Sequence, residues 1–438
     1  MTSKSYSTLP GTADKDAVRP FAVDIADTEV ERMLALVKLS NVASACYENS
    51  LPDGSRRLGL GRDWLVEAKR VWETDFDWKS LEKHMNSFPH FQADVPIAGS
   101  QSTTSLKVHF VALFSEQPTA TPIVLLHGWP GSFLEFLPML ALLRDKYPDP
   151  AQLPYHIIVP SFPGYTLSDA FPADRDYGME DTTRVLDALV VQRLGLPGYV
   201  VQGGDVGSRV GRIMAAQYPG CIGTLPNYCP LPPPAGAATG GLTETDQRDL
   251  ERTAWFKSEG SAYSMMQATR PGTLGLVLSS SPLALLAWVG EKFLDWVDPA
   301  SFPPDASMAG SSGGSSNNKG ATSYSTRLMH EVLASVSLYW LTGRAHTCMY
   351  SYRETFSTRG DPLSSHALPA YHIREPKKLG FSYFPLDIAP TPREWIAATG
   401  NLVFWRRHDV GGHFAALEQP AALLADLEEF VGSFSAVS

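Results

Sequence analysis

The densest group of residues that could do chemistry is the pentapeptide GGDVG at positions 203–207. It follows the apolar run YVVQ at 199–202 and precedes a stretch with helical spacing of apolar residues. A strand, a sharp turn and a helix in this order are typical of a nucleophile elbow, which lifts one side chain above the end of a sheet. We therefore predict that Asp205 is a nucleophile and that the backbone N–H of Val206 is an oxyanion donor.

A carboxylate at such a turn implies a particular kind of substrate. It is already ionised, so it needs no base to activate it, and it attacks an sp³ carbon to give an alkyl ester. The expected electrophile is an epoxide or an alkyl halide. The alternative interpretation is that Asp205 only caps the following helix. The formal G-x-S-x-G match around Ser312 lies in a Gly/Ser-rich segment with no preceding strand, and we attribute it to chance.

Three further segments could complete a catalytic site. The segment HGWP at 127–130 follows a buried strand, where the N–H of Trp129 would be a second oxyanion donor. His413 lies in a Gly-rich loop after the last predicted strand and is favoured as the base over His408. Asp387 ends the preceding strand pattern and is favoured as the orienting acid over Asp409.

The elements that would position these residues alternate between strand and helix patterns from about residue 105 to 228. This alternation predicts βαβ units and a parallel sheet. It breaks at PLPPPAGAATGG (230–241), gives way to about 130 helical residues, and resumes at 379–387. The sequence thus predicts an α/β core with a helical cap inserted in it.

We predict the following boundaries from these changes of pattern: a disordered arm over 1–20, an N-terminal extension over 21–115, core segments over 116–235 and 376–438, and a cap over 236–375 with a flexible loop at 305–322.

Composition excludes several classes of function. The chain has 438 residues, is 44% hydrophobic and carries a formal net charge of -10, which argues against nucleic acid or an anionic membrane as the main partner. The N-terminus lacks the apolar core of a secretory signal. The apolar stretch 273–290 is interrupted by polar residues, which predicts two helical segments and no membrane anchor. The four cysteines have no metal-ligand spacing, and so few in a chain of this length fit a reducing compartment. With no anchor we expect a cytoplasmic protein, and attack by a carboxylate requires no metal or organic cofactor.

Six stretches together resemble the epoxide hydrolases of the microsomal type, in their soluble fungal branch. They are HGWPGSFLEF (127–136), GGDVGSRVGR (203–212), VLSSSPLALLAWVGEKF (277–293), FPLD (384–387), TPREWIAATGNLVF (391–404) and GGHFAALE (411–418). The resemblance implies an α/β-hydrolase fold, the extra N-terminal domain of that family and a triad of Asp205, His413 and Asp387. It also implies a small epoxide as substrate, a vicinal diol as product, and a homodimer.

The resemblance further implies two cap tyrosines that bind and protonate the epoxide oxygen. The family pattern matches Tyr263 in GSAYSM and Tyr352 in YSYRET. Tyr350 is a competing neighbour, and we choose Tyr352 because Arg353 and Glu354 follow it directly. An insertion around 308–323 departs from the family pattern.

Two other functions fit parts of the pattern. A haloalkane dehalogenase would use the same nucleophile, but it would need side-chain donors for a halide; Trp129 could supply one and Val206 could not. A non-catalytic small-molecule binding protein of this fold usually lacks one member of the triad, whereas all three are present here.

Overall fold

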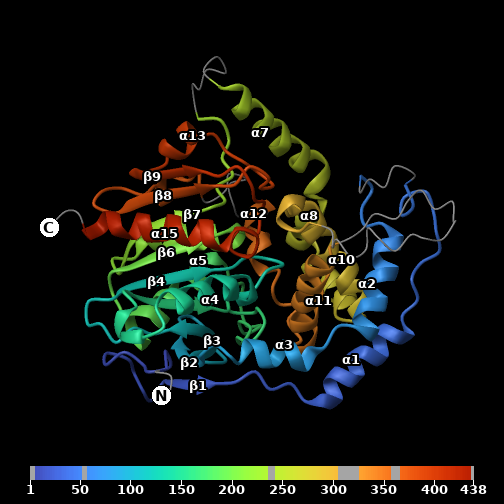
Figure 1. Cartoon of the computed structure of the whole chain (residues 1–438), viewed down its shortest axis with the longest axis horizontal. Helices are drawn as coiled ribbons and strands as arrows, with labels where there is room; N and C mark the ends of the chain where they lie inside the picture. The colour runs from blue at the N-terminus through green and yellow to red at the C-terminus, as the bar shows by residue number, and fades with distance from the viewer. Residues whose placement is uncertain (1–4, 52–56, 235–241, 304–324, 357–365, 436–438) are drawn as a thin grey trace.

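The computed structural model describes residues 5–51, 57–234, 242–303, 325–356 and 366–435. Within these ranges a nine-stranded sheet forms the centre of the molecule (Figure 1). Its spatial order is β1 (Val18–Phe21), β2 (His90–Pro96), β3 (Ser105–Leu113), β5 (Tyr155–Pro160), β4 (Thr121–Leu126), β6 (Tyr199–Gly203), β7 (Cys221–Pro226), β8 (Lys378–Tyr383) and β9 (Leu402–Arg407). The strands from β5 to β9 in this order run parallel, and β1, β2 and β3 add an antiparallel edge.

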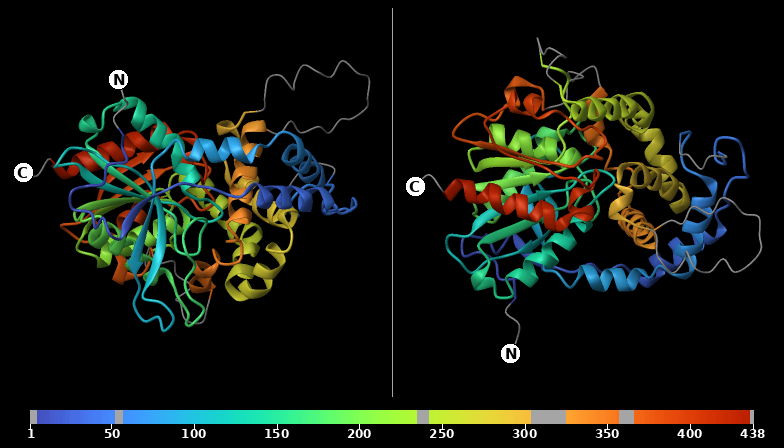
Figure 2. Two further views of the ribbon diagram at one scale, coloured as in Figure 1. Left: turned by 90° about the horizontal axis from the view of Figure 1, so that it is seen from below. Right: turned by 45° about the horizontal axis from the view of Figure 1, so that its top comes forward.

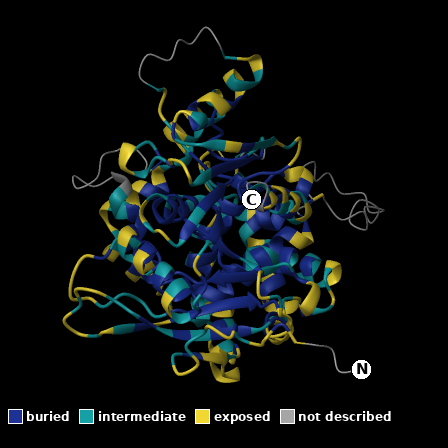
Figure 3. Cartoon of the chain, turned by 90° about the vertical axis from the view of Figure 1, so that its left-hand side faces the viewer, coloured by how far each residue is buried: buried dark blue, intermediate teal, exposed yellow. Residues whose placement is uncertain are grey.

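Helices cover both faces of the parallel strands, which explains why these strands are apolar on both sides. On one face η1 (Phe133–Phe136) and α4 (Leu137–Lys146) pack beside α14 (Ala415–Glu418) and α15 (Pro420–Ser435). On the other face lie α5 (Met179–Asp187), the short helix η3 (Ala188–Arg193) and α6 (Asp205–Gln217). The central strands are buried and the exposed residues lie mainly on the outer helices and loops (Figure 3). The predicted α/β core is therefore confirmed.

A block of helices between β7 and β8 forms the predicted cap. It consists of α7 (Glu244–Trp255), α8 (Ala262–Thr269), α9 (Pro271–Leu278), α10 (Pro282–Trp296), α11 (Thr326–Leu341) and α12 (Arg353–Phe356). The predicted flexible loop at 305–322 and the chance motif around Ser312 lie outside the described residues.

In the part of the chain that the structure covers, no single helix is long and apolar enough to cross a membrane. Helices α9 and α10 together are long and apolar enough by length and composition alone, but the chain bends by 116° between them.

The N-terminal helices lie on the outer side of the cap. Helices α1 (Asp27–Leu39), α2 (Arg62–Thr74) and α3 (Trp78–Met85) contact α10 or α11 and extend around them (Figures 1 and 2). Trp72 is fully buried there, and its indole N–H donates to the hydroxyl of Ser337 at 3.0 Å. The aromatic residues of this segment therefore attach the extension to the cap.

The prediction that residues 1–20 are disordered is wrong for residues 5–20. Val18 begins strand β1, which pairs antiparallel with β2, and Tyr6 is buried. The backbone N–H of Phe114 also donates to the carbonyl of Tyr6 at 3.1 Å. A polar segment can be ordered by backbone hydrogen bonds to the edge of a sheet, and the composition of the segment does not reveal that pairing.

We expect Trp72→Ala to lower the free energy of unfolding by about 3–5 kcal/mol, because it removes a large buried ring and leaves the Ser337 hydroxyl without its donor. Denaturant unfolding measures the effect. Val66→Ala on the same helix is the matched control, because Val66 is 39% exposed and its truncation should change the free energy little. Equal effects of the two substitutions would show that α2 is not anchored through Trp72.

Candidate active site

The elbow forms where β6 passes into α6. Asp205 is the first residue of α6 and has φ +44°, a backbone conformation that non-glycine residues rarely adopt. A Cβ at Gly207 would overlap the carbonyl oxygens of Leu126 and His127 at the end of β4. The close approach of α6 to β4 therefore requires a glycine at position 207, as the tight turn in the sequence predicts.

The carboxylate of Asp205 is surrounded by groups that stabilise its charge. Its Oδ1 accepts the backbone N–H of Trp129 at 2.9 Å. Burial acts to raise the pKa of Asp205, but His413 and the N–H groups of Trp129 and Val206 outweigh burial and leave this pKa below its usual value. Asp205 is thus ionised at neutral pH, and the two N–H groups beside it are those of the predicted oxyanion donors.

The structure brings His413 and Asp387 together with Asp205. The Nε2 atom of His413 lies 3.3 Å from Oδ2 of Asp205. The two groups form an ion pair, but their geometry is not that of a hydrogen bond. The Nδ1 atom of His413 is 2.7 Å from Oδ1 of Asp387. Burial acts to lower the pKa of His413, but the two carboxylates raise it to about 10. The imidazole is therefore positively charged when Asp205 is ionised.

The loop that carries His413 is held by a buried carboxyl that the sequence interpretation missed. Glu418 accepts the backbone N–H groups of Asp298, Gly412 and Phe414 at 2.7, 2.8 and 2.9 Å. The N–H of His413 itself donates to the carbonyl of Trp296 at 2.9 Å. The available signal was a single acidic residue in the otherwise apolar run FAALE at 414–418.

The loop that carries Asp387 is fastened to the cap. Arg252 of α7 donates to the carbonyl oxygens of Asp387 and Leu386 at 2.6 and 2.8 Å. The N–H of Ile388 donates to Oδ1 of Asp387 at 2.6 Å. These contacts fix the orientation of the carboxylate toward His413.

The competing residues lie elsewhere. His408 bonds through Nε2 to Oδ2 of Asp426 at 2.7 Å, and its ring stacks on Phe384. Asp409 is exposed. His127 of the HGWP segment is buried, and its Nε2 accepts the N–H of Phe162 at 3.2 Å. These contacts give His408 and His127 a structural role.

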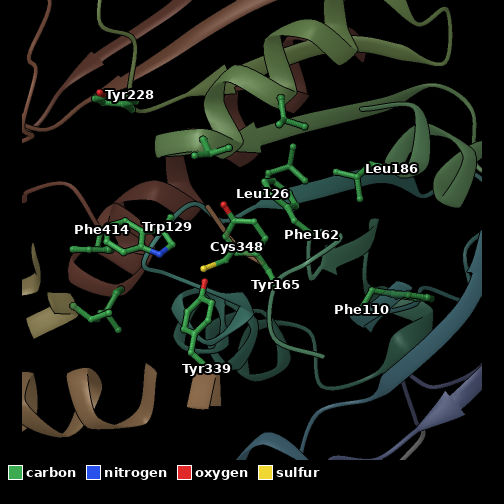
Figure 4. Close-up of a cluster of buried hydrophobic side chains, with 14 of the residues drawn as sticks. Phe110, Leu126, Trp129, Phe162, Tyr165, Leu186, Tyr228, Tyr339, Cys348 and Phe414 are labelled. Carbon is green, nitrogen blue, oxygen red and sulfur yellow. The ribbon is translucent and has the colours of Figure 1, made fainter. Parts of the chain in front are cut away.

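The two tyrosines from the cap face each other above Trp129. The ring of Tyr263 in α8 stacks on Trp129 at 5.4 Å, and the ring of Tyr352 lies 5.8 Å from both Tyr263 and Trp129. Burial raises the pKa of both phenols well above its usual value, and the charge of Asp205 raises it further. Figure 4 shows Trp129 among the buried side chains of Phe414, Tyr339 and Cys348.

Tyr350 lies two residues from Tyr352 and points to a different partner. Both belong to the short 3-10 helix η7 (Tyr350–Tyr352). The hydroxyl of Tyr350 is 2.6 Å from that of Thr182 in α5. The hydroxyl of Tyr352 is buried and has no hydrogen-bond partner among the described residues. The geometry therefore favours Tyr352 as the group available to a ligand.

Comparisons with known proteins show the family to which the chain belongs. Residues 18–136 match a family model described as epoxide hydrolase N terminus, and residues 121–240 match the alpha/beta hydrolase fold. A putative epoxide hydrolase of Dothistroma septosporum is 39% identical over 428 residues, covering 98% of this chain and 93% of that protein. The chain belongs to the epoxide hydrolase family. The predicted resemblance and the predicted fold are thereby confirmed.

Solved structures of other epoxide hydrolases have the same fold. The epoxide hydrolase of Aspergillus niger superposes with a TM-score of 0.84 at 41% identity, over 98% of this chain and all of that one. The juvenile hormone epoxide hydrolase of the silkworm Bombyx mori superposes with a TM-score of 0.78 at 24% identity, over 99% of each chain. The second likeness supports the fold alone.

Proposed function

We propose that the protein hydrolyses epoxides to vicinal diols through a covalent ester on Asp205. The observation that carries this proposal is the position of the Asp205 carboxylate, 2.9 Å from the N–H of Trp129 and 3.3 Å from the imidazole of His413. A carboxylate on an elbow is suited to attack at an sp³ carbon, and an adjacent base is suited to the hydrolysis of the resulting ester. Membership of the epoxide hydrolase family supports the same reaction.

In the first step an oxygen of Asp205 forms a bond to one epoxide carbon while the bond from that carbon to the epoxide oxygen breaks. The electron pair of the broken bond goes to the epoxide oxygen, which takes a proton from Tyr263 or Tyr352. Burial keeps both phenols protonated in the resting site, because it raises the pKa of each. They are therefore available as acids when the developing alkoxide needs a proton.

In the second step His413 takes a proton from water, and the hydroxide formed attacks the carbonyl carbon of the ester. The N–H groups of Trp129 and Val206 stabilise the oxyanion, an effect typically worth about 3 kcal/mol for each donor. Collapse of the tetrahedral intermediate releases the diol oxygen, which receives the proton held by His413. The carboxylic acid of Asp205 then gives its proton to the imidazole, which restores the charged pair of the resting site. Asp387 orients the imidazole during both transfers, at 2.7 Å from Nδ1.

Esterification itself converts His413 from a cation to a base. The charge of Asp205 is one cause of the raised pKa of His413, and this charge disappears when the carboxylate becomes an ester. The pKa of the imidazole must then fall, since burial still lowers it and Asp387 still raises it. The imidazolium gives up its proton, and the tyrosinate left by the first step takes one up, so both groups are neutral before water is activated. We propose that the base is activated in this way only after the nucleophile has reacted.

The charged form of His413 should also stabilise the fold in a pH-dependent manner. Its pKa is about 10 in the folded state and about 6.5 in an unfolded chain, so the contribution is complete below pH 6.5 and is lost as the pH rises through 10. We expect the difference in unfolding free energy between the wild type and His413→Gln to shrink by several kcal/mol between pH 7 and 11. Denaturant unfolding at a series of pH values measures this difference, and a constant difference would contradict it.

A single-turnover reaction in ¹⁸O-labelled water tests the covalent route. With enzyme in excess over styrene oxide, the label should enter Asp205 and be absent from the first diol formed. Label in the first diol would show direct attack of water on the epoxide.

A haloalkane supplied in place of the epoxide tests the dehalogenase alternative. We expect no release of halide, and release of halide would support that alternative.

The homodimer and the cytoplasmic location stay predictions. The described surface offers a place for a second copy, because α8 and α9 expose the apolar side chains of Met265, Met266, Leu276 and Val277. Leu276 is 77% exposed. Light scattering of the purified protein measures the mass in solution.

A further inference from the structure

A chain of buried polar side chains runs from the second turn of α6 back to the nucleophile. Ser208 and Arg212 follow Asp205 by three and seven residues, so all three share one face of the helix. The hydroxyl of Ser208 donates to the backbone carbonyl of Asp205 at 2.6 Å. His366 bridges the other two, with Nε2 at 3.1 Å from the Ser208 hydroxyl and Nδ1 at 2.9 Å from Nε of Arg212. We call these three side chains the elbow relay.

The hydrogen bonds of the elbow relay all point in one direction. Nε of Arg212 can only donate, so Nδ1 of His366 accepts and its proton lies on Nε2. Nε2 then donates to Ser208, whose own proton goes to the carbonyl of Asp205. Burial and the charges of Arg212 and Arg209 keep the pKa of His366 well below its usual value, so the imidazole stays neutral. The relay therefore carries polarisation from a cation to one peptide group.

Among the described residues no carboxylate forms a hydrogen bond or ion pair with the cation at the start of the relay. Arg212 is fully buried, and its other described partners are the Thr399 carbonyl and hydroxyl and the Cys229 sulfur, none of them a carboxylate. Buried charges are usually paired with an opposite charge, because desolvating them is costly. An unneutralised guanidinium in a medium of low polarity exerts a strong field along its hydrogen bonds.

The peptide group at the end of the relay is the one that carries an oxyanion donor. The carbonyl of Asp205 and the N–H of Val206 belong to the same planar amide, in which withdrawing electrons at oxygen makes the N–H a stronger donor. We propose that Ser208, His366 and Arg212 are positioning residues that strengthen the Val206 N–H as a donor to the oxyanion. The inference rests on the proposed two-step function.

The relay should act mainly on the second step. During ester hydrolysis, negative charge builds up on the Asp205 oxygen that the Val206 N–H binds, so a stronger donor lowers the barrier. During alkylation the carboxylate loses charge, so the same donor gives no advantage. Loss of a group that merely holds the elbow in shape would instead slow both steps.

Ser208→Ala tests the inference with styrene oxide in single-turnover experiments, in which mass spectrometry of quenched samples follows the ester on Asp205. We expect ester decay to slow about tenfold while ester formation stays within about twofold of wild type. Ser382→Ala is the matched control, because Ser382 is also fully buried and its hydroxyl has no partner in the described part of the chain. Unchanged decay, or equal slowing of both steps, would overturn the relay.

A second pair of variants gives the same comparison if Ser208→Ala does not fold. His366→Gln keeps an N–H that can donate to Ser208, whereas His366→Leu removes it. Ester decay should therefore be slower in His366→Leu than in His366→Gln, and equal rates would overturn the relay. If the wild type forms no ester at all, the proposed function fails, which is distinct from ester formation with unchanged decay in the variants.

Discussion

Replacing His413 with glutamine should leave a protein that is alkylated by an epoxide but releases diol about a thousandfold more slowly than wild type. The reason is that His413 is the base for the second step, whereas attack by Asp205 needs no base. The glutamine amide keeps a donor for Asp387, which His413 contacts at 2.7 Å, so the buried carboxylate is not left unpaired. Intact-protein mass spectrometry after exposure to styrene oxide should show the mass of one bound epoxide.

His408→Gln is the matched control for this experiment. His408 is partly buried and, like His413, is paired with a carboxylate, but its partner is Asp426. Its loss should leave diol formation within a few-fold of wild type. If His413→Gln showed no added mass, Asp205 would not be the nucleophile or the imidazole would be needed for attack, and the two-step route would be wrong.

The second large effect is expected from the double substitution Tyr263→Phe and Tyr352→Phe. It removes both acids that can protonate the epoxide oxygen and retains the ring packing on Trp129. Because general acid catalysis typically contributes 10²–10⁴-fold, we expect alkylation of Asp205 to slow by about that factor. Rapid quenching followed by mass spectrometry measures the rate of ester formation, and each single variant should show a smaller loss.

Tyr350→Phe distinguishes this chemistry from a general effect of removing a cap phenol. Its hydroxyl contacts Thr182, 2.6 Å away, and lies outside the proposed site. The variant should form the ester at close to the wild-type rate. A large loss in Tyr350→Phe with none in Tyr352→Phe would show that the choice between the two neighbours was wrong.

Much of the site was predictable because chemistry at an elbow imposes local constraints on the sequence. The glycines beside Asp205, the HGWP segment and the loop of His413 each occur at a strand end, and their order along the chain follows the sheet. Position in the sheet then brings side chains from distant segments together. The fold class was also predictable from local sequence, because the spacing of apolar residues distinguishes strands from helices and so shows their alternation.

The supporting contacts were not predictable in this way. His366 reaches Ser208 and Arg212 from a loop more than 150 positions away, and no local pattern marks it. In the sequence Glu418 looks like an ordinary helix residue. Only the structure shows that its carboxyl accepts three backbone N–H groups. The N-terminal arm looked disordered because its order depends on distant partners, such as β2, which pairs with β1 from about 70 residues further along the chain. Such contacts depend on tertiary structure.

The helices of the N-terminal extension limit how the cap can move. Helices α10 and α11 pack between the core on one side and α1 and α2 on the other, so they cannot swing outward without unpacking Trp72. We therefore expect the cap to open little when a substrate binds. Selection among epoxides would then depend on molecular dimensions, because a cap held from outside adapts little to the size of its substrate.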